Sequence, residues 1–201
     1  RPPLLEKSSR YVSLDPAPRR NLELTESLRS SEGPSLFSTI DHCLTSMGSR
    51  MLRAWVTQPL REPGEPRARH RAIGELIASP QLEAALAEAM KALPDLERIA
   101  SRIALGSARP RELAGLRDAM PRLQALADAA SGAASPCIRD AAPALRPAPE
   151  LVHELEAALL PEPAVTLREG EVIDSGYSEE LKELRALRDH AGDFLSEIEA
   201  R

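Results

Sequence analysis

Histidine and cysteine are the side chains of this chain with the greatest capacity for chemistry, and their spacing indicates structural roles. The four histidines are scattered, and neither they nor the two cysteines form a CxxC or Cys/His pattern that could hold a metal ion. His42 stands beside Cys43, an order in which an imidazole could activate a thiol as a nucleophile. Adjacent side chains on a helix point about 100° apart, however, so sequence neighbours are poor candidates for contact. We therefore expect no catalytic pair and no metal ligand.

Phosphate-binding chemistry is the second possibility that the residue types raise. The sequence contains neither a GxxxxGK[ST] loop nor a GxGxxG pattern, so it has no cradle for a nucleotide phosphate. Arg67, Arg69 and Arg71 form a short basic cluster that could contact phosphate, with a solvated loop as the alternative. The formal net charge of −5 argues against a broad basic surface for nucleic acid. Any DNA contact must therefore be local.

The composition favours packed helices over a sheet. Hydrophobic residues make up 42% of the 201 residues, yet the aromatics are one Trp, two Tyr and two Phe, so Leu, Ala, Ile, Val and Met must build the core. Cys43 and Cys137 fit reduced thiols in the cytoplasm. No apolar run approaches the ~20 residues of a membrane span. The start at Arg1 followed by two prolines favours an excised fragment, with a processed natural terminus as the alternative.

Apolar residues at helical spacing, separated by prolines and caps, predict a chain of helices. The exceptions are a short strand at 21–25, a loop at 61–70 and a small hairpin in which 165–167 pair with 172–173 across Gly170. Thr45 should cap a helix that Pro59 stops, and Ser79, Asp95 and Arg109 should precede three further helices. Pro121 falls inside the last of these, which predicts a kink or break.

One uninterrupted helix is predicted for residues 177–201. Its apolar stripe includes Leu184, and its other side chains mix acidic residues with Lys182, Arg185 and Arg188. Such a mixture is typical of a solvated face with i,i+3 and i,i+4 pairs, and the alternative is a docking surface for another domain. At ~1.5 Å per residue this helix would reach roughly 37 Å, about the width of a domain.

Four stretches resemble, in the same order, the motifs of the MutS family of DNA mismatch repair proteins. Residues 14–15 and 20–24 are similar to the LD…RNLEL signature, and residues 40–60 to the LD…T..MG.R.L..W…PL segment. Residues 95–113 are similar to DLER…R.A…ARPR.L, and residues 173–185 to I.SGY..EL..LR. Together the stretches extend over most of positions 11–201, so the ordered set is far more specific than any one of its members.

The resemblance implies an all-α fold: a multihelical core with a small β-hairpin and a long C-terminal lever helix. It places the end of a connector or linker at 1–13, the core domain at 14–176 and the start of the lever, leading to a DNA clamp, at 177–201. In MutS proteins such a core joins the ATPase domain to the clamp, so the chain itself would perform no catalysis. ATP and Mg would belong to the ATPase domain of the parent protein, outside this chain. The implied partners are mismatched double-stranded DNA, other MutS domains, a second MutS subunit in a homodimer, and MutL.

Six apolar residues are our candidates for a common structural core, and one glycine is our candidate hinge. The core candidates are Met47, Met51, Trp55, Leu96, Ile99 and Leu184. Gly176 is the hinge candidate because glycine accepts backbone angles that other residues resist, the alternative being a simple turn at the start of a helix. A stand-alone helical adaptor is the other function that the sequence leaves open, and an enzyme is a distant third.

Overall fold

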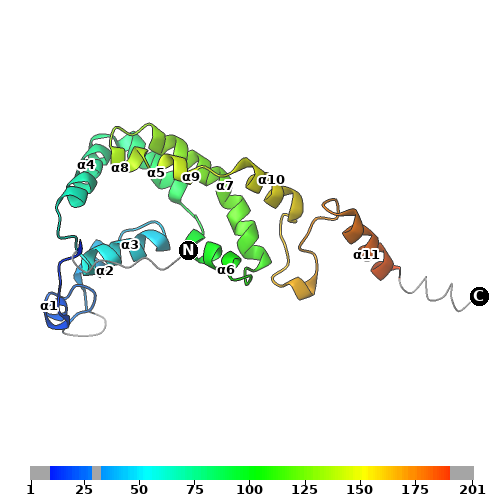
Figure 1. Cartoon of the computed structure of the whole chain (residues 1–201), viewed down its shortest axis with the longest axis horizontal. Helices are drawn as coiled ribbons and strands as arrows, with labels where there is room; N and C mark the ends of the chain where they lie inside the picture. The colour runs from blue at the N-terminus through cyan, green and yellow to red at the C-terminus, as the bar shows by residue number, and fades with distance from the viewer. Residues whose placement is uncertain (1–9, 29–32, 191–201) are drawn as a thin grey trace, which may run out of the picture. The chain divides into compact units, whose positions relative to one another are not determined.

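The computed structural model describes residues 10–28 and 33–190, and within them the chain is mostly helical (Figure 1). The first helices are α1 (Pro16–Asn21), α2 (Leu36–Ile40), α3 (Ser46–Thr57), α4 (Gly64–Ala78), α5 (Pro80–Met90) and α6 (Leu96–Ala104). They are followed by α7 (Pro110–Ser131), α8 (Pro136–Arg139), α9 (Ala142–Leu145), α10 (Pro149–Ala158), the 3-10 helix η2 (Leu167–Glu169) and α11 (Glu179–Asp189). The all-α prediction is confirmed for these residues.

Local signals place most helix starts. Thr45 Oγ1 accepts a hydrogen bond from Gly48 N–H at 3.1 Å, which satisfies a free donor in the first turn of α3. Ser178 Oγ does the same for Leu181 N–H at the start of α11. Proline occupies the first position of α5, where its missing N–H costs nothing. The predicted starts after Thr45, Ser79, Asp95 and Arg109 are confirmed.

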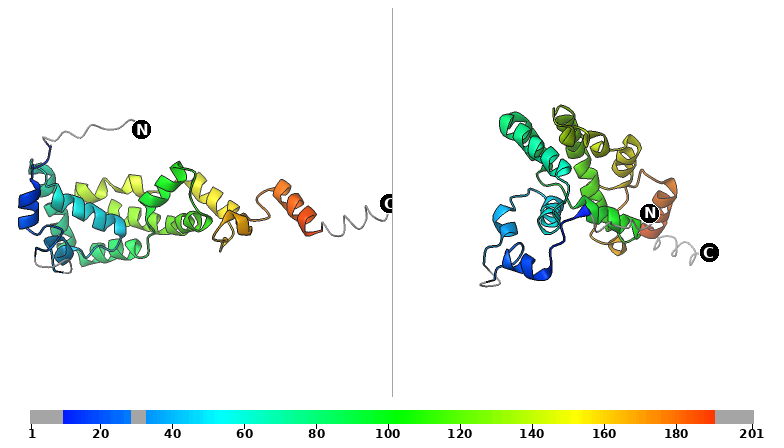
Figure 2. Two further views of the ribbon diagram at one scale, coloured as in Figure 1. Left: turned by 90° about the horizontal axis from the view of Figure 1, so that it is seen from below. Right: turned by 60° about the vertical axis from the view of Figure 1, so that its left-hand side comes forward.

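The chain divides into two compact units, and α6 and α7 contribute residues to both. The first unit comprises Arg1–Glu97 and Pro121–Arg146. In it α4 packs against α5 and α8, which lie together in the views of Figure 1 and Figure 2. Its buried cluster joins α5 to the C-terminal half of α7 and to α9 through Leu86, Ala89, Leu126, Ala130 and Ala142. Small alanines let these helices approach closely.

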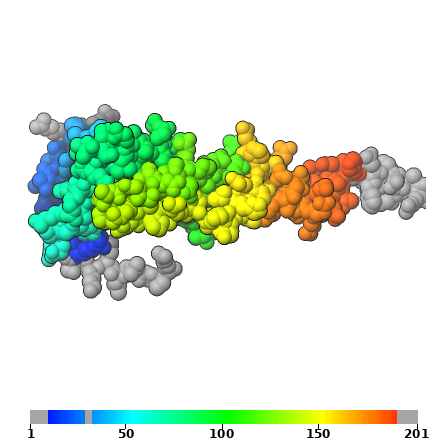
Figure 3. All heavy atoms as spheres, turned by 90° about the horizontal axis from the view of Figure 1, so that it is seen from above, coloured from blue at the N-terminus to red at the C-terminus, as the bar shows by residue number. Residues whose placement is uncertain are grey.

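The second unit comprises Arg98–Met120 and Pro147–Arg201. The Arg117 guanidinium donates to the Leu160 and Pro161 carbonyls, at 2.8 Å each, and so ties α7 to the loop after α10. Leu159 pairs with Ile173 in an isolated antiparallel bridge, and both Leu159 and Val172 are buried. Figure 3 shows the atoms of α10 and of the following segment, in yellow and orange, in contact with each other.

Two predicted β elements are wrong. Residues 21–25 are not a strand, because Asp15 and Pro16 begin the short helix α1, which ends at Asn21 and continues into turns. Residues 165–167 do not pair with 172–173, because η2 begins at Leu167 and Ile173 pairs with Leu159 instead. The chain does fold back after α10, but Pro161 and Pro163 supply no N–H, and no named strand forms among the described residues.

Three helix boundaries also differ from the prediction. The predicted loop at 61–70 is helical from Gly64 onward, since Pro66 lies in the first turn of α4, where proline is tolerated. At Pro121, where a kink or a break was predicted, the helix is not broken, because α7 runs through this residue to Ser131. The predicted helix at 177–201 begins at Glu179, after the Ser178 cap, and ends at Asp189, with His190 as its C-cap. The part of this prediction from residue 191 onward lies outside the described residues.

Candidate functional site

The α3 helix carries three of the six core candidates, and two of these are exposed. Met51 and Trp55 have 53% and 41% of their surface accessible, whereas Met47 is half-buried. The three share a face of α3 and line an open pocket of about 430 Å³ within the first unit, together with Tyr11 and Leu60. The helical spacing therefore identified a shared apolar face, but no described residue covers all of it.

Charged side chains form the rim of this pocket and cover part of the indole. The guanidinium carbon of Arg69 lies 3.7 Å from the centroid of the Trp55 ring, a cation–π contact. Glu65 holds Arg69 in place through an ion pair and also accepts from Arg10 at 3.0 Å. These hydrogen bonds and charges, led by the bond from Arg10, lower the pKa of Glu65. The indole thus has a cation held against its ring.

A second charged group, on the same rim, joins α3 to the start of α6. The Arg50 guanidinium donates to both carboxylate oxygens of Asp95, at 2.6 and 2.8 Å, and to Glu97 at 2.6 Å. Ser46 donates to the same Asp95 carboxylate at 3.0 Å. Hydrogen bonding to Asp95, and then to Glu97, raises the pKa of Arg50. Helical spacing does not predict this contact, although Asp95 and Glu97 belong to the DLER motif at residues 95–98.

The six core candidates do not form one buried cluster. Ile99 is buried at 6% exposure, Leu96 is half-buried, and Leu184 on α11 is 56% exposed. Ile99 and Leu184 belong to the second unit, and Met47, Met51, Trp55 and Leu96 to the first. The prediction is wrong for Met51, Trp55 and Leu184, because periodicity shows which side chains share a helix face and not what covers that face.

The candidate hinge, Gly176, lies in a tight turn before α11. Its N–H donates to Asp174 Oδ1 at 2.7 Å, and an added Cβ would lie 3.2 Å from the same oxygen. Its φ is outside the left-handed region, which only Gly106 and Gly170 enter among the described glycines. The close approach of Asp174 is therefore what favours glycine at this position.

Several contacts fasten the start of α11 to the end of α10. Asp174 N–H donates to the Ala158 carbonyl at 2.8 Å, and Arg185 donates to the Ile173 carbonyl at 2.9 Å. The Tyr177 hydroxyl donates to the Glu154 carboxylate, which raises the pKa of Tyr177. Arg185 is half-buried, so this bond is partly shielded from water. We call this set of contacts the α10–α11 joint.

The neighbouring His42 and Cys43 lack the chemistry of an activated nucleophile. Burial raises the pKa of the Cys43 thiol, and the Asp41 carboxylate raises it further. A nucleophilic cysteine requires the opposite shift, because the thiolate is the reactive form. Across residues 10–28 and 33–190, no group of three or more His, Cys, Asp or Glu side chains could hold a metal ion. In the same ranges no helix is both long and apolar enough to cross a bilayer.

These features define a helical domain whose polar side chains join helices to one another. Comparison with known families agrees with this description: the family model of MutS domain III matches residues 17–200. The chain belongs to this family and is therefore part of a MutS-family mismatch repair protein. The resemblance first noted in the four motifs is confirmed.

Proposed function

We propose that this chain is the core domain and the start of the lever of a MutS-type protein, and that it couples an ATPase domain to a DNA clamp. In this proposal residues 1–13 end a connector, 14–176 form the core and 177–201 begin the lever helix. The ATPase domain and the clamp lie in other parts of the parent protein. The chain transmits conformational change and performs no catalysis of its own.

The α10–α11 joint is the observation that carries the proposal. Coupling between distant sites needs an element that moves as a body, and such an element must be held firmly at its base. Tyr177, which lies two residues before α11, and Arg185, in its second turn, bind Glu154 of α10 and the Ile173 carbonyl. The turn at Ser175 and Gly176 lies between the Asp174 and Tyr177 anchors, and we propose it as the hinge at which the angle of the lever is set.

The chemistry of the parent protein lies outside this chain in our proposal. The sequence supplies no GxxxxGK[ST] phosphate loop, which supports a nucleotide site elsewhere in the parent protein. We place both ATP and Mg in the ATPase domain. Mismatched double-stranded DNA, the other MutS domains, a second MutS subunit in a homodimer and MutL are the partners of the parent, which we place in the cytoplasm.

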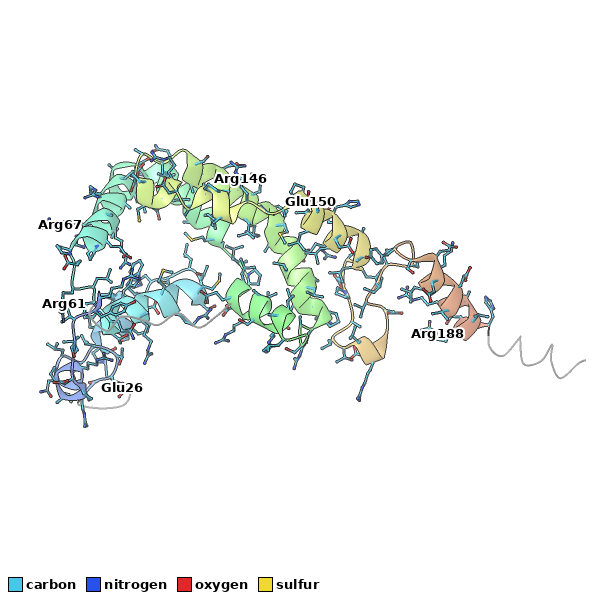
Figure 4. All side chains as sticks on the ribbon, in the orientation of Figure 1. Glu26, Arg61, Arg67, Arg146, Glu150 and Arg188 are labelled. Carbon is cyan, nitrogen blue, oxygen red and sulfur yellow. The ribbon has the colours of Figure 1, made fainter. Side chains whose placement is uncertain are left out.

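The test compares two arginines one turn apart in the full-length protein. Arg185 donates to a backbone carbonyl of the joint, whereas Arg188 is exposed and pairs with its neighbour Asp189 (Figure 4). We expect Arg185→Ala to reduce the change that ATP causes in affinity for mismatched duplex, with ATP binding retained. Arg188→Ala should leave that change intact. Because binding coupling is reciprocal, the effect of mismatched DNA on ATP affinity must fall by the same factor.

If ATP changed the affinity for mismatched duplex by the same factor in both variants and in the unchanged protein, the proposed role of the α10–α11 joint would be refuted. A stand-alone helical adaptor is the second candidate function, favoured by the exposed apolar faces of α3 and α11. The reading frame separates the two candidates. Our proposal requires it to continue past Arg201 into a phosphate-loop ATPase, and a frame without that domain would favour the adaptor.

A further inference from the structure

Two exposed arginines lie one above the other on α4. Arg67 and Arg71 are four residues apart, so their side chains share a face of the helix and are offset by about 6 Å along its axis. Arg67 is labelled in Figure 4, near the N-terminal end of α4. Both side chains belong to the basic cluster Arg67, Arg69 and Arg71. The Arg69 side chain already contacts Trp55 and Glu65.

The acidic side chains nearest in sequence on α4 are already engaged elsewhere. Glu65 pairs with Arg10 and Arg69. Glu75, one turn beyond Arg71, accepts from the backbone N–H groups of Ala134 and Ser135 at 2.6 and 2.7 Å. Within the part of the chain that the structure describes, neither Arg67 nor Arg71 forms an ion pair. Their charges are therefore available to an outside partner.

The arrangement of these charges is unfavourable for α4 by itself. Like charges at i,i+4 repel each other on a helix surface. Arg67 also lies close to the N-terminal end of α4, where the helix dipole disfavours a cation. An external anion would relieve both effects, since it would neutralise the arginines and interact well with the N-terminal end. The two arginines are therefore unfavourable for the stability of α4 and favourable for the binding of an anion.

Two glycines flank the arginines on the same face. Gly64, Arg67, Arg71 and Gly74 follow one another at intervals of three, four and three residues, which is the spacing of one helix face. An added Cβ at either glycine would meet no atom within 4 Å. The face is therefore open and has no side chain at either end, so a partner could approach the helix closely. We call these four residues the α4 basic face.

We propose that the α4 basic face binds the sugar–phosphate backbone of double-stranded DNA without reading its sequence. The planar guanidinium groups can each donate two hydrogen bonds to a phosphate. Because they are long and offset by about 6 Å along the helix, the two side chains can reach different phosphates of one strand. An acidic protein surface could also pair with these arginines; we choose DNA as the ligand because the proposed function places this chain in a DNA-binding protein. The contact itself is local, as the net charge of −5 requires.

Salt dependence of duplex binding measures this contact directly. The probe is a short, fully paired, fluorescein-labelled duplex, titrated with the 201-residue chain from about 50 to 200 mM salt and followed by anisotropy. Each phosphate contact contributes about 0.9 to the slope of log K against log salt. We expect R67Q/R71Q to bind more weakly and to reduce that slope by about 1.8. Circular dichroism should show unchanged helix content, because both side chains are exposed.

The matched control removes two exposed arginines elsewhere, as R168Q/R188Q, and changes the net charge equally. We expect its slope to equal that of the unchanged chain. Equal loss in both variants, or no measurable binding by the unchanged chain at the lowest salt, would overturn the proposal. So would displacement of the duplex by poly-glutamate as effectively as by unlabelled duplex. This assay uses paired DNA and no ATP, so its failure is distinguishable from a failure of ATP coupling in the full-length protein.

Discussion

Arg69 holds its guanidinium carbon 3.7 Å from the centre of the Trp55 ring and connects α4 to α3. The sequence predicts that Trp55 is buried in an apolar core. In the structure its indole is 41% exposed, and a cation, not a closed core, shields part of it. Glu65 pairs with the same guanidinium, so the stack and the ion pair share one side chain. The consequence is that Arg69 should matter for the packing of an aromatic residue as well as for charge.

Removal of the Arg69 side chain should expose the indole further. Trp55 is the single tryptophan of the chain, so its emission reports this site alone. We expect Arg69→Ala to shift the emission to longer wavelength and to lower the free energy of unfolding by about 1 kcal/mol, the usual value of such a contact. Glu65→Gln is the control, because it removes the ion pair and leaves the Arg69 side chain and an oxygen that can accept from it, so its emission should shift less than that of Arg69→Ala. Unchanged emission in Arg69→Ala would contradict the stack.

Replacement by alanine should change the stability of the chain in opposite directions at two glycines with equally open surroundings. No atom lies within 4 Å of a Cβ added at Gly106 or at Gly74, but Gly106 has φ +63° and Gly74 lies inside α4. We expect Gly106→Ala to cost about 1 kcal/mol because an L side chain strains the left-handed backbone. Gly74→Ala should stabilise α4 by roughly 0.5–1 kcal/mol. Urea unfolding of both variants measures the difference, and equal effects would contradict the assigned backbone at Gly106.

The helices could be predicted from the sequence because their signals are local. Thr45 lies three residues from the N–H that it caps, and Pro59 follows the helix that it helps to stop. The burial of Trp55 could not be predicted in the same way, since it depends on what lies over the helix face. The bond from Ser135 N–H to Glu75 joins residues 60 apart, and no spacing rule predicts it. Pairs at such separations can be identified only from the folded chain.

Asp95 and Glu97 bind the same arginine but should differ in their importance. Asp95 contacts two nitrogens of Arg50 and also accepts from Ser46, with 18% of its side chain exposed, whereas Glu97 accepts from one nitrogen of Arg50 and is 63% exposed. Solvent screens the exposed pair more strongly. We expect Asp95→Asn to lower the melting temperature clearly more than Glu97→Gln does. Equal losses, measured by circular dichroism at one pH and salt, would contradict a dominant Asp95 contact.

The Glu112 carboxylate should make part of the stability of this chain dependent on pH. It accepts from Arg109 N–H at 2.9 Å and from Arg102 at 2.6 Å. The backbone bond, followed by that from Arg102, holds the pKa of Glu112 below its usual 4.5. A carboxylate with a lowered folded pKa stabilises the fold above pH 4.5, and this stabilisation is lost as the pH falls through the folded value.

Comparison of Glu112→Gln with the unchanged chain isolates this effect, because acid-induced changes at other groups are common to both. We expect the unchanged chain to be more stable at neutral pH and the difference to shrink steadily below pH 4.5. Glu150→Gln is the control, since Glu150 is an exposed glutamate in the first turn of α10 (Figure 4). Its difference from the unchanged chain over the same range measures the effect of removing one exposed carboxylate at the start of a helix. A Glu112→Gln difference that stays constant from neutral pH into acid would mean that the folded chain does not favour the charged carboxylate, because only the ionised form gains from both donors.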